Sequence, residues 1–345
     1  MLGIGIIGFG YWGPNVVRNF MESREAAERR VVDLRQDRLE LLGRRYPTVQ
    51  AGRDAGDLIK DPKIDAIVIA TPTASHFALA MQALSAGKHV LVEKPMTATV
   101  AEADRLVIEA QRRGLILMVD HTFGYTPAVR CIRELITRGD LGQIFYYDST
   151  RINLGLFRRD ANVMWDLAVH DLSILAYLFK EEPIAVAATG KSHFGGNLEN
   201  LAYLTLSFAS DAIAHINVNW LAPVKIRRTI IGGSRKMVVY DDLEPSEKIK
   251  VYDKGIHATD DPEQVRSVLI GYRIGDMWAP RLDTTEALST VTSHFVDCVL
   301  KQRKPDTDGQ AGLSVLRVLE AATQSMQRNG ELVHLSALKR GSSLS

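Results

Sequence analysis

The chain has 345 residues, with 42 lysines and arginines against 41 aspartates and glutamates, which gives a formal net charge of +1. A hydrophobic fraction of 46% and a charged fraction of 24% are typical of globular proteins and exclude a disordered chain, a collagen-like chain and a coiled-coil rod. The neutral charge balance disfavours a dedicated nucleic-acid or membrane partner, and the length indicates two domains.

The two cysteines, Cys131 and Cys298, lie too far apart in the sequence to form a Cys-x-x-Cys pair. That spacing excludes a disulfide framework and a thiolate zinc site, so we expect no bound metal and a reducing compartment. No stretch reaches the roughly 18 apolar residues of a membrane-spanning helix, and the apolar N-terminus lacks the basic leader of a signal peptide. We therefore predict a cytoplasmic protein.

The first third of the chain alternates apolar strands with amphipathic helices. Four short apolar runs are typical of strands buried on both faces. They cover residues 3–7, 66–70, 89–92 and 115–119. Because repeated strand–helix units form parallel sheets, residues 1–121 are predicted to form a doubly wound α/β domain of the Rossmann type.

The hydrophobic pattern changes after residue 121. Between residues 214 and 219 the even-numbered positions are apolar and the odd-numbered positions are polar, as in a strand with one buried face. One-sided strands of this kind favour an antiparallel sheet covered by helices on one face. Apolar helical stripes at 288–299 and 315–326 end the chain. Residues 122–345 are therefore predicted to form an α+β domain on an open, mainly antiparallel sheet.

A Gly-x-Gly-x-x-Gly motif directly follows the first predicted strand. Its residues are Gly8, Phe9, Gly10, Tyr11, Trp12 and Gly13. Glycine at these places permits a tight turn, lets the backbone approach a pyrophosphate and allows close helix–strand packing, while the helix N-terminus adds positive partial charge. We interpret the motif as a dinucleotide-binding loop. The alternative is a glycine-rich turn in another kind of α/β protein.

Asp33 lies twenty residues after Gly13, where a carboxylate can accept a hydrogen bond from a ribose hydroxyl. Arg35 follows and could meet a 2′-phosphate, so NAD is favoured as the cofactor and NADP is the alternative. Only Val31 and Val32 precede Asp33 as apolar strand residues. The opposing interpretation is therefore that Asp33 is an acid in a solvated loop.

Two further groups of residues have the chemistry of a catalytic site. Lys94, in Glu93-Lys94-Pro95, follows a buried strand at the edge where open α/β sheets bind ligands, and its amine could hydrogen-bond a substrate oxygen. Asp166 and His170 are one helical turn apart, so the carboxylate could orient the imidazole as a general base. Taken alone, the first pattern is also typical of a surface turn and the second of a surface ion pair.

Taken together, these motifs resemble the Gfo/Idh/MocA oxidoreductase family along nearly the whole chain. The matching residues are Gly8, Gly10 and Gly13, Ala70-Thr71-Pro72 with His76, Glu93-Lys94-Pro95, and Asp166 with His170. The resemblance implies a nicotinamide cofactor and hydride transfer at a secondary alcohol or ketone of a sugar or cyclitol. It also implies that Lys94, Asp166 and His170 are the catalytic residues.

The resemblance extends to the residues around the cofactor. Thr71, Pro72 and His76 would line it, and Glu93 would lie beside it. His121, at the end of a predicted strand, could line the nicotinamide pocket, and a hydrogen-bonded core histidine is the alternative. The predicted cofactor-binding set is Gly8, Phe9, Gly10, Tyr11, Trp12, Gly13, Asp33, Arg35, Thr71, Pro72, His76, Glu93, Lys94 and His121.

The segment from Arg151 to Trp165 resembles the branch of the family that acts on nucleotide sugars. The predicted substrate-binding set is Lys94, Arg151, Asn153, Arg158, Trp165, Asp166 and His170. Arginine forks suit diphosphates, so Arg151, Arg158 and Arg159 favour a nucleotide sugar. The resemblance implies UDP-N-acetylglucosamine, oxidised at C3, as such a substrate. A solvated basic loop is the alternative for these arginines. For the protein, the alternatives are a dehydrogenase of a free sugar or inositol-like cyclitol and a cofactor-sensing regulator without catalysis.

The uncovered face of the predicted antiparallel sheet needs a partner. Tyr147, Ile213 and Trp220 indicate apolar surface on that face, and pairing two such sheets would bury it. We therefore predict a homodimer or homotetramer, with a small-molecule substrate as the other binding partner.

Overall fold

The computed structural model describes residues 1–23, 25–155, 161–193, 196–253, 255–257, 271–273 and 275–336. The chain divides into two compact units. Unit 1 consists of Met1–Thr126 and Thr285–Glu320, and unit 2 consists of Pro127–Thr284 and Ala321–Ser345. The first unit is thus made of two separate stretches of sequence.

Unit 1 is built on a six-stranded parallel sheet with the strand order β3-β2-β1-β4-β5-β6. The strands are β1 (Leu2–Ile7), β2 (Ala26–Val32), β3 (Gln50–Gly52), β4 (Ala66–Ile69), β5 (His89–Glu93) and β6 (Leu117–Asp120). The strand order reverses between β1 and β4, which is the place where doubly wound sheets bind dinucleotides. The predicted Rossmann sheet is confirmed.

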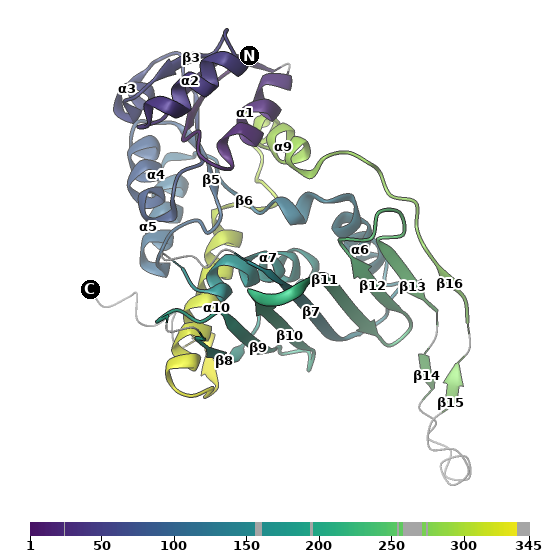
Figure 1. Ribbon diagram of the computed structural model, residues 1–345. Helices are drawn as coiled ribbons and strands as arrows, with labels where there is room; N and C mark the ends of the chain where they lie inside the picture. Colours follow the sequence, from purple (N-terminus) through teal and green to yellow (C-terminus); the bar gives the residue numbers. More distant parts are fainter. Residues whose placement is uncertain are drawn as a thin grey trace. The chain divides into compact units, whose positions relative to one another are not determined.

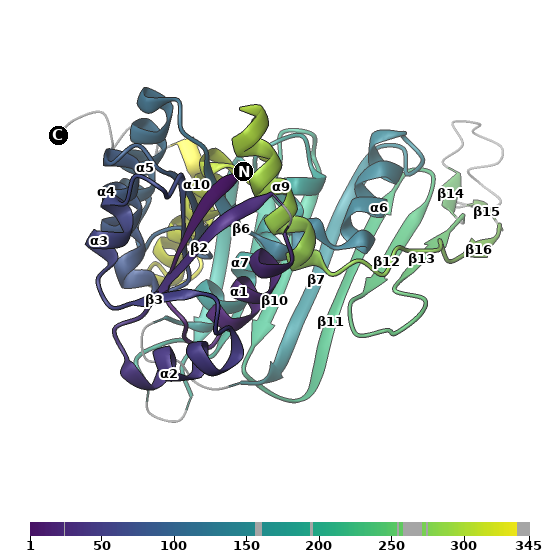
Figure 2. The same ribbon diagram turned by 90° about the horizontal axis from the view of Figure 1, so that it is seen from above.

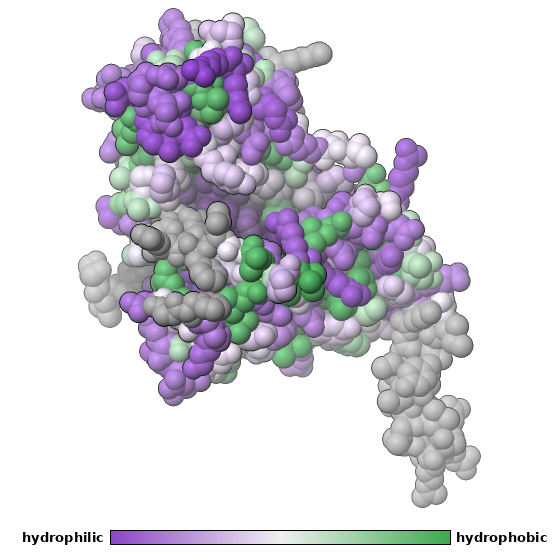
Figure 3. All heavy atoms as spheres, in the orientation of Figure 1, coloured by the Kyte–Doolittle hydropathy of each residue, from purple (hydrophilic) through white to green (hydrophobic). Residues whose placement is uncertain are grey.

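Helices cover both faces of this sheet, which explains why β1 and β4 are buried at every position. The helices between the strands are α1 (Gly13–Glu22), α2 (Gln36–Arg45), α3 (Ala55–Lys60), α4 (His76–Ser85) and α5 (Val100–Arg113). Figure 2 shows α4 and α5 on one face and α1 on the other. Only Leu42 of α2 is buried, and the surface around α2 and α3 is hydrophilic (Figure 3).

Strand β2 is longer than its two apolar residues suggested. Its outer part contains Arg29 and Arg30, whose side chains have local partners. Arg29 donates hydrogen bonds to the carbonyls of Phe20 and Ser23, and Arg30 pairs with the carboxylate of Asp61. These contacts satisfy the charges along the strand, which therefore extends to the residue before Asp33.

The segment from Thr285 to Glu320 belongs to unit 1, although the sequence boundary at residue 121 assigned it to the second domain. It contains α9 (Ala287–Lys301) and the first part of α10 (Gly309–Gln327). Leu288, Val291 and Phe295 share one hydrophobic core with Ile4 and Val16. The apolar stripe was predicted correctly, but a stripe fits against either sheet, so the sequence did not reveal which one it covers.

Unit 2 is built on a nine-stranded sheet with the order β16-β13-β12-β11-β7-β10-β9-β8-β17. Only β7 and β10 are parallel neighbours, so the mainly antiparallel sheet is confirmed. The strands are β7 (Ile144–Leu154), β8 (Ala185–Lys191), β9 (Leu201–Ser207), β10 (Ile213–Asn219), β11 (Leu221–Gly233), β12 (Met237–Asp241), β13 (Ile249–Tyr252), β16 (Met277–Trp278) and β17 (Val333–His334). A separate two-stranded sheet pairs β14 (Gly255–His257) with β15 (Gly271–Arg273).

Helices cover one face of the nine-stranded sheet, as Figure 1 shows for α6 (Pro127–Thr137) and α7 (Val169–Leu178). Side chains of β7 and β10 alternate between this covered face and an open face, as predicted. Tyr147 and Trp220, however, are buried on the covered side, which corrects their predicted place on the open face. Ile213 does lie on the open face, where 48% of it is exposed. Strand alternation gave the two faces but not which one the helices cover.

Cys131 lies in α6 and Cys298 in α9, both as reduced thiols, as expected. Among the described residues, no helix combines the length and hydropathy needed to cross a membrane.

Candidate functional site

The loop after β1 has the steric design of a pyrophosphate-binding turn. Gly8 adopts a φ of 103°, and a Cβ there would lie 2.5 Å from the carbonyl oxygen of Ala70. A Cβ on Gly13 would lie 2.4 Å from the carbonyl oxygen of Gly8, so this glycine lets α1 begin against the loop. Gly10 differs, because its Cβ would meet only Arg35 Nη2, at 3.9 Å. The space beside the Gly10 backbone is therefore open, so a pyrophosphate can approach the backbone there.

This difference gives a prediction for Gly10→Ala. We expect the variant to keep the thermal stability of the parent protein, because the methyl group meets no main-chain atom, but to bind NAD at least about tenfold more weakly, because it occupies the approach of the phosphates. Calorimetric titration and thermal unfolding measure the two effects. Gly43→Ala in α2 is the matched control, since its Cβ also lies in open space. Unchanged NAD affinity in Gly10→Ala would remove the loop from cofactor binding.

Asp33 is anchored at the glycine loop and is not a solvated loop acid. Its Oδ2 accepts a hydrogen bond from the backbone N–H of Phe9 at 2.7 Å, and its Oδ1 accepts one from the N–H of Arg35 at 2.9 Å. Its side chain is only 10% exposed, whereas the Arg35 side chain beside it is 52% exposed. The carboxylate therefore stands at the end of β2, where it can meet a ribose hydroxyl.

The aromatic residues of the loop have different environments. The Phe9 side chain lies in the hydrophobic core, so it can offer a cofactor only its backbone. Tyr11 is 94% exposed. Trp12 packs against the core, and its indole N–H makes a long, 3.4 Å hydrogen bond to Asp120 Oδ2. Trp12 therefore connects the loop to the end of β6.

His76 was predicted to line the cofactor, but its ring contacts the protein backbone. Its ring is buried, with Nδ1 lying 2.9 Å from the Pro95 carbonyl oxygen and Nε2 lying 2.8 Å from that of Thr71. Burial lowers the pKa of His76, which favours the neutral ring. The imidazole thus ties together the chain segments that follow β4 and β5. Thr71 itself is half-buried and Pro72 is exposed, so these two residues remain at the surface of the strand ends.

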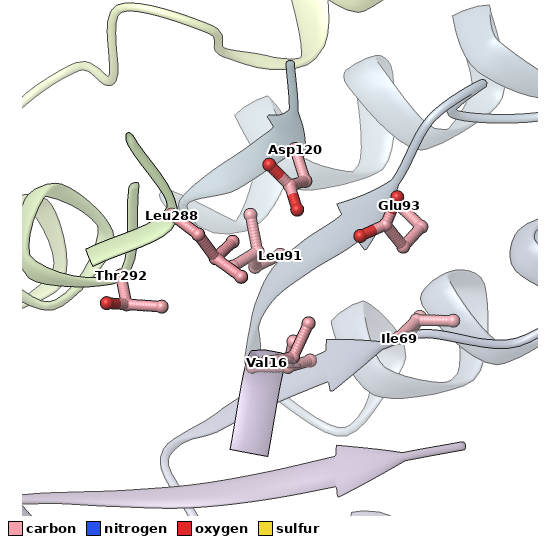
Figure 4. A pocket seen from close by; sticks show the side chains of 8 residues that line it. Val16, Ile69, Leu91, Glu93, Asp120, Leu288 and Thr292 are labelled. Carbon is pink, nitrogen blue, oxygen red and sulfur yellow. The ribbon is translucent and has the colours of Figure 1, made fainter. Parts of the chain in front are cut away.

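Lys94 directly follows β5, at the carboxyl edge of the sheet, as predicted. Glu93 and Asp120 are register partners on β5 and β6, and Glu93 Oε2 accepts a hydrogen bond from the Lys94 backbone N–H. Burial, followed by the charge of Asp120 and a hydrogen bond to it, raises the pKa of Glu93 well above its usual range. Figure 4 shows both carboxyl groups at the ends of neighbouring strands, above Leu91.

His121 follows Asp120 and is 3% exposed. Within the described part of the chain, neither of its ring nitrogens has a hydrogen-bond partner. Burial, with a smaller contribution from the positive charge of Lys94, lowers the pKa of His121 to about 3, so the ring is neutral at pH 7. A buried imidazole with two unsatisfied nitrogens is costly, which favours a ligand-facing role over the alternative of a hydrogen-bonded core histidine.

In unit 2, Asp166 lies in a π-helical turn, Met164–Ala168, that leads directly into α7 and His170. The sequence predicted a regular helix here. The turn begins after Asn162, whose Oδ1 accepts the Trp165 backbone N–H at 3.1 Å, and Asp166 Oδ2 accepts the indole N–H of Trp220 at 3.3 Å. Single wide turns of this kind often occur at functional sites.

Arg151 corrects a prediction. Its guanidinium was expected to bind a substrate diphosphate, but its side chain is only 5% exposed and forms a two-pronged ion pair with Asp171. The two contacts are 2.7 Å from Nε to Oδ2 and 3.2 Å from Nη2 to Oδ1. Ser149 Oγ donates a third hydrogen bond to Asp171 Oδ1 at 2.7 Å. The group holds α7, and so the backbone of His170, against β7.

The other predicted substrate-binding residues have mixed positions. Asn153 is half-buried near the end of β7. Trp165 is half-buried, and its indole N–H donates to Thr323 Oγ1 at 3.1 Å. Arg158 and Arg159 lie outside the described residues. Arg227, in β11, pairs with Asp242 at 3.1 Å.

Two residues at these sites were missed from the sequence. Neither Asp120, the last residue of β6, nor Asp171, in α7, belongs to the predicted sets of site residues. Their partners appear only in the folded chain: strand pairing places Asp120 beside Glu93, and the packing of α7 on β7 brings Asp171 to Arg151. Among the described residues, no group of three or more histidine, cysteine or acidic side chains is placed to hold a metal ion.

The chain matches two family models that together cover most of its length. Residues 2–121 match the Gfo/Idh/MocA model described as an oxidoreductase family, NAD-binding Rossmann fold. Residues 133–335 match the model of the family's C-terminal alpha/beta domain. Three features of unit 1 fit a bound dinucleotide. They are the close backbone packing at Gly8 and Gly13, the anchored carboxylate of Asp33 and the buried His121 ring without hydrogen-bond partners among the described residues.

Named relatives are similar over nearly full length. A UDP-N-acetylglucosamine 3-dehydrogenase of Acidithiobacillus ferrooxidans is 28% identical over 327 residues, covering 93% of this chain and 95% of the relative. A myo-inositol 2-dehydrogenase of Thermotoga maritima is 24% identical and covers 94% of this chain and 96% of the relative. A solved structure of the Acidithiobacillus dehydrogenase superposes with a TM-score of 0.78 at 25% identity, covering 94% of this chain and 97% of that one. The chain belongs to the Gfo/Idh/MocA family of oxidoreductases and carries its NAD-binding Rossmann domain.

Proposed function

We propose that this oxidoreductase transfers hydride between NAD and a secondary alcohol or ketone of a sugar-type substrate. The observation that carries the proposal is the combination of the NAD-binding glycine loop with Lys94, Asp166 and His170 at the predicted family positions. Relatives named as dehydrogenases of a nucleotide sugar and of a cyclitol support the substrate class.

The proposed roles divide the chemistry among three side chains. His170 takes the hydroxyl proton as general base, Asp166 orients His170, and Lys94 polarises the same oxygen. NAD, when bound, accepts or returns the hydride. The protein contributes positioning and electrostatics, which are the usual work of a protein around a nicotinamide.

We further propose a nucleotide sugar such as UDP-N-acetylglucosamine, oxidised at C3, as the substrate. The similarity to the UDP-N-acetylglucosamine 3-dehydrogenase over nearly the whole chain supports this choice. Arg151 is buried against Asp171 and is not available to a substrate diphosphate. We propose that Arg158 and Arg159 recognise the diphosphate instead.

A comparison of substrates tests this refinement. We expect kcat/KM for UDP-N-acetylglucosamine to exceed that for free N-acetylglucosamine by at least about a hundredfold, because a bound diphosphate supplies binding energy remote from the reacting carbon. The rate of NADH formation, read from its absorbance, measures both. Equal efficiencies would mean that the protein does not recognise the nucleotide, and activity on inositols alone would favour the cyclitol alternative suggested by the second relative.

NAD is the proposed physiological cofactor in preference to NADP. The carboxylate of Asp33, held by two backbone N–H groups, would repel a 2′-phosphate but accept a ribose hydroxyl. Arg35 is exposed beside it and is the residue that an NADP enzyme would use.

We also propose that two or four copies of the chain assemble through the open face of the nine-stranded sheet. Tyr146, Tyr203 and Ile213 are exposed there, at 37%, 41% and 48%. Light scattering at micromolar concentration is expected to give the mass of a dimer or tetramer, because pairing would bury these side chains. A monomeric mass would contradict the proposal. The cytoplasmic location and the absence of nucleic-acid or membrane partners remain predictions of the sequence.

A further inference from the structure

Glu93 and Asp120 form a carboxyl pair at the ends of neighbouring strands. They are partners in the parallel register of β5 and β6, and both carboxyl groups line one cavity. Two carboxyl groups that share a buried site repel each other when both are ionised, which favours a proton on one of them. The pair lines a small cavity of unit 1 (Figure 4). The other lining residues are Val16, Val68, Ile69, Leu91, Leu288 and Thr292.

The hydrogen-bond donors around the pair lie at Asp120 and not at Glu93 Oε1. Asp120 Oδ1 accepts the hydroxyl hydrogen of Thr122 at 2.7 Å, and Oδ2 faces the indole N–H of Trp12 at 3.4 Å. Glu93 Oε1, in contrast, is buried and has no partner within the described part of the chain. Donors stabilise a carboxylate, and burial without donors favours the neutral acid. These contacts therefore favour a proton on Glu93.

The charged neighbours of the pair come from the two strand ends. Lys94 contributes a positive charge that favours ionisation of Glu93, but burial and the charge of Asp120 outweigh it. His121 is neutral at pH 7. Helices α1 and α9 present only Val16, Leu288 and Thr292 to the cavity, none of which titrates. The local charge thus depends on whether a single proton is present.

The pair lies on the opposite side of the switch point from Asp33, where a bound dinucleotide would place its nicotinamide end. The two halves of a dinucleotide lie on opposite sides of the switch point between β1 and β4, and Asp33 at the end of β2 marks the adenosine side. The ends of β5 and β6, with Lys94 and the unsatisfied His121 ring, are on the other side. The nicotinamide ring is a cation when oxidised and neutral when reduced, so this half of the site meets two different charges.

We propose that the Glu93–Asp120 pair is a proton-linked sensor of the cofactor's redox state. The pair holds one proton in the free protein and beside reduced cofactor, and it releases that proton to solvent when oxidised cofactor binds. The second carboxylate then offsets the positive ring. When the ring gains a hydride it loses its charge, and the pair takes up one proton again. The inference rests on the NAD site and needs no substrate, so its failure and that of the proposed sugar chemistry are distinguishable.

Titration calorimetry in buffers of different ionisation enthalpy measures the proton directly. We expect NAD⁺ binding to release up to about one proton and NADH binding to release almost none. Because NAD⁺ would prefer the doubly ionised pair, its dissociation constant should fall by up to about tenfold per pH unit as pH rises through the titration of the free pair. The dissociation constant of NADH should not follow this trend.

Two variants locate the effect. Glu93→Gln imitates the protonated acid and Asp120→Asn removes the other carboxylate, so both should abolish the difference in proton release between NAD⁺ and NADH. Glu109→Gln in α5 is the matched control, since its carboxylate pairs with Arg112 and Arg113 and should not alter the linkage. Circular dichroism checks that each variant folds. Equal proton release for NAD⁺ and NADH in the parent protein would overturn the proposal, as would undiminished release in both folded variants. If neither variant folds, the parent titrations alone decide between the outcomes.

Discussion

Replacing His170 with alanine is expected to lower turnover by about 10²–10⁴-fold and to leave the affinity for NAD unchanged. The magnitude is that of a lost general base. The expected separation of the two effects follows from the organisation of the chain, because the glycine loop and Asp33 belong to unit 1 and His170 belongs to unit 2. Steady-state rates with saturating substrate measure the first quantity, and calorimetric titration with NAD measures the second.

His215→Ala is the control for this experiment. That histidine lies on the open face of the sheet of unit 2, where its Nδ1 is 3.7 Å from Asp148 Oδ1 and its side chain is 46% exposed. Its removal should leave turnover within about twofold of the parent protein, because it lies on the face proposed for assembly and has no role in the proposed chemistry. Parent-like turnover in His170→Ala would remove this residue from the mechanism.

Asp171→Asn is expected to destabilise the protein by about 3–5 kcal/mol, the usual consequence of leaving one member of a buried ion pair without its partner. Asp171 and Arg151 have side chains only 2% and 5% exposed, so water cannot replace the lost carboxylate. Ser149 would also lose its charged acceptor. Urea denaturation at pH 7, with the unfolding of unit 2 followed by tryptophan fluorescence, measures the change.

A double substitution separates the buried charge from other effects. Arg151→Met combined with Asp171→Leu removes both charges and should recover most of the lost stability, as buried pairs replaced by apolar residues often do. Asp211→Asn, in the exposed turn between β9 and β10, is the control and should change the unfolding free energy by less than about 0.5 kcal/mol. A loss below about 1 kcal/mol in Asp171→Asn would show that the pair is not as buried in solution as the contacts indicate.

The NAD-binding half of the protein could be predicted because its sequence signals are local. Gly13 is required by the carbonyl oxygen of Gly8, five residues earlier, and Gly8 is required by its own φ of 103°, so the local spacing reveals the loop. The same holds for Lys94, whose place after a buried strand assigns it to the ligand-binding edge. Such features depend on short-range geometry, which a sequence pattern carries directly.

The features that the sequence did not give depend on partners far along the chain. Arg151 has a side chain that suits a substrate diphosphate. Only its pairing with Asp171, twenty positions later, shows that it is structural. The side chains of Tyr147 and Trp220 alternate as predicted, but no pattern within a strand says which face the helices will cover. The carboxyl pair of Glu93 and Asp120 likewise requires the register between two parallel strands.

Residues 285–320 belong to unit 1 although they follow most of unit 2 in the sequence, which has a consequence for synthesis on the ribosome. The face of β1 that carries Ile4 is completed by Leu288 and Phe295, which are translated after the whole strand-rich part of unit 2. A nascent chain that has emerged only as far as residue 126 must therefore leave part of its NAD-binding half uncovered. The cofactor domain can reach its final packing only late in translation, when the C-terminal helices emerge and close it.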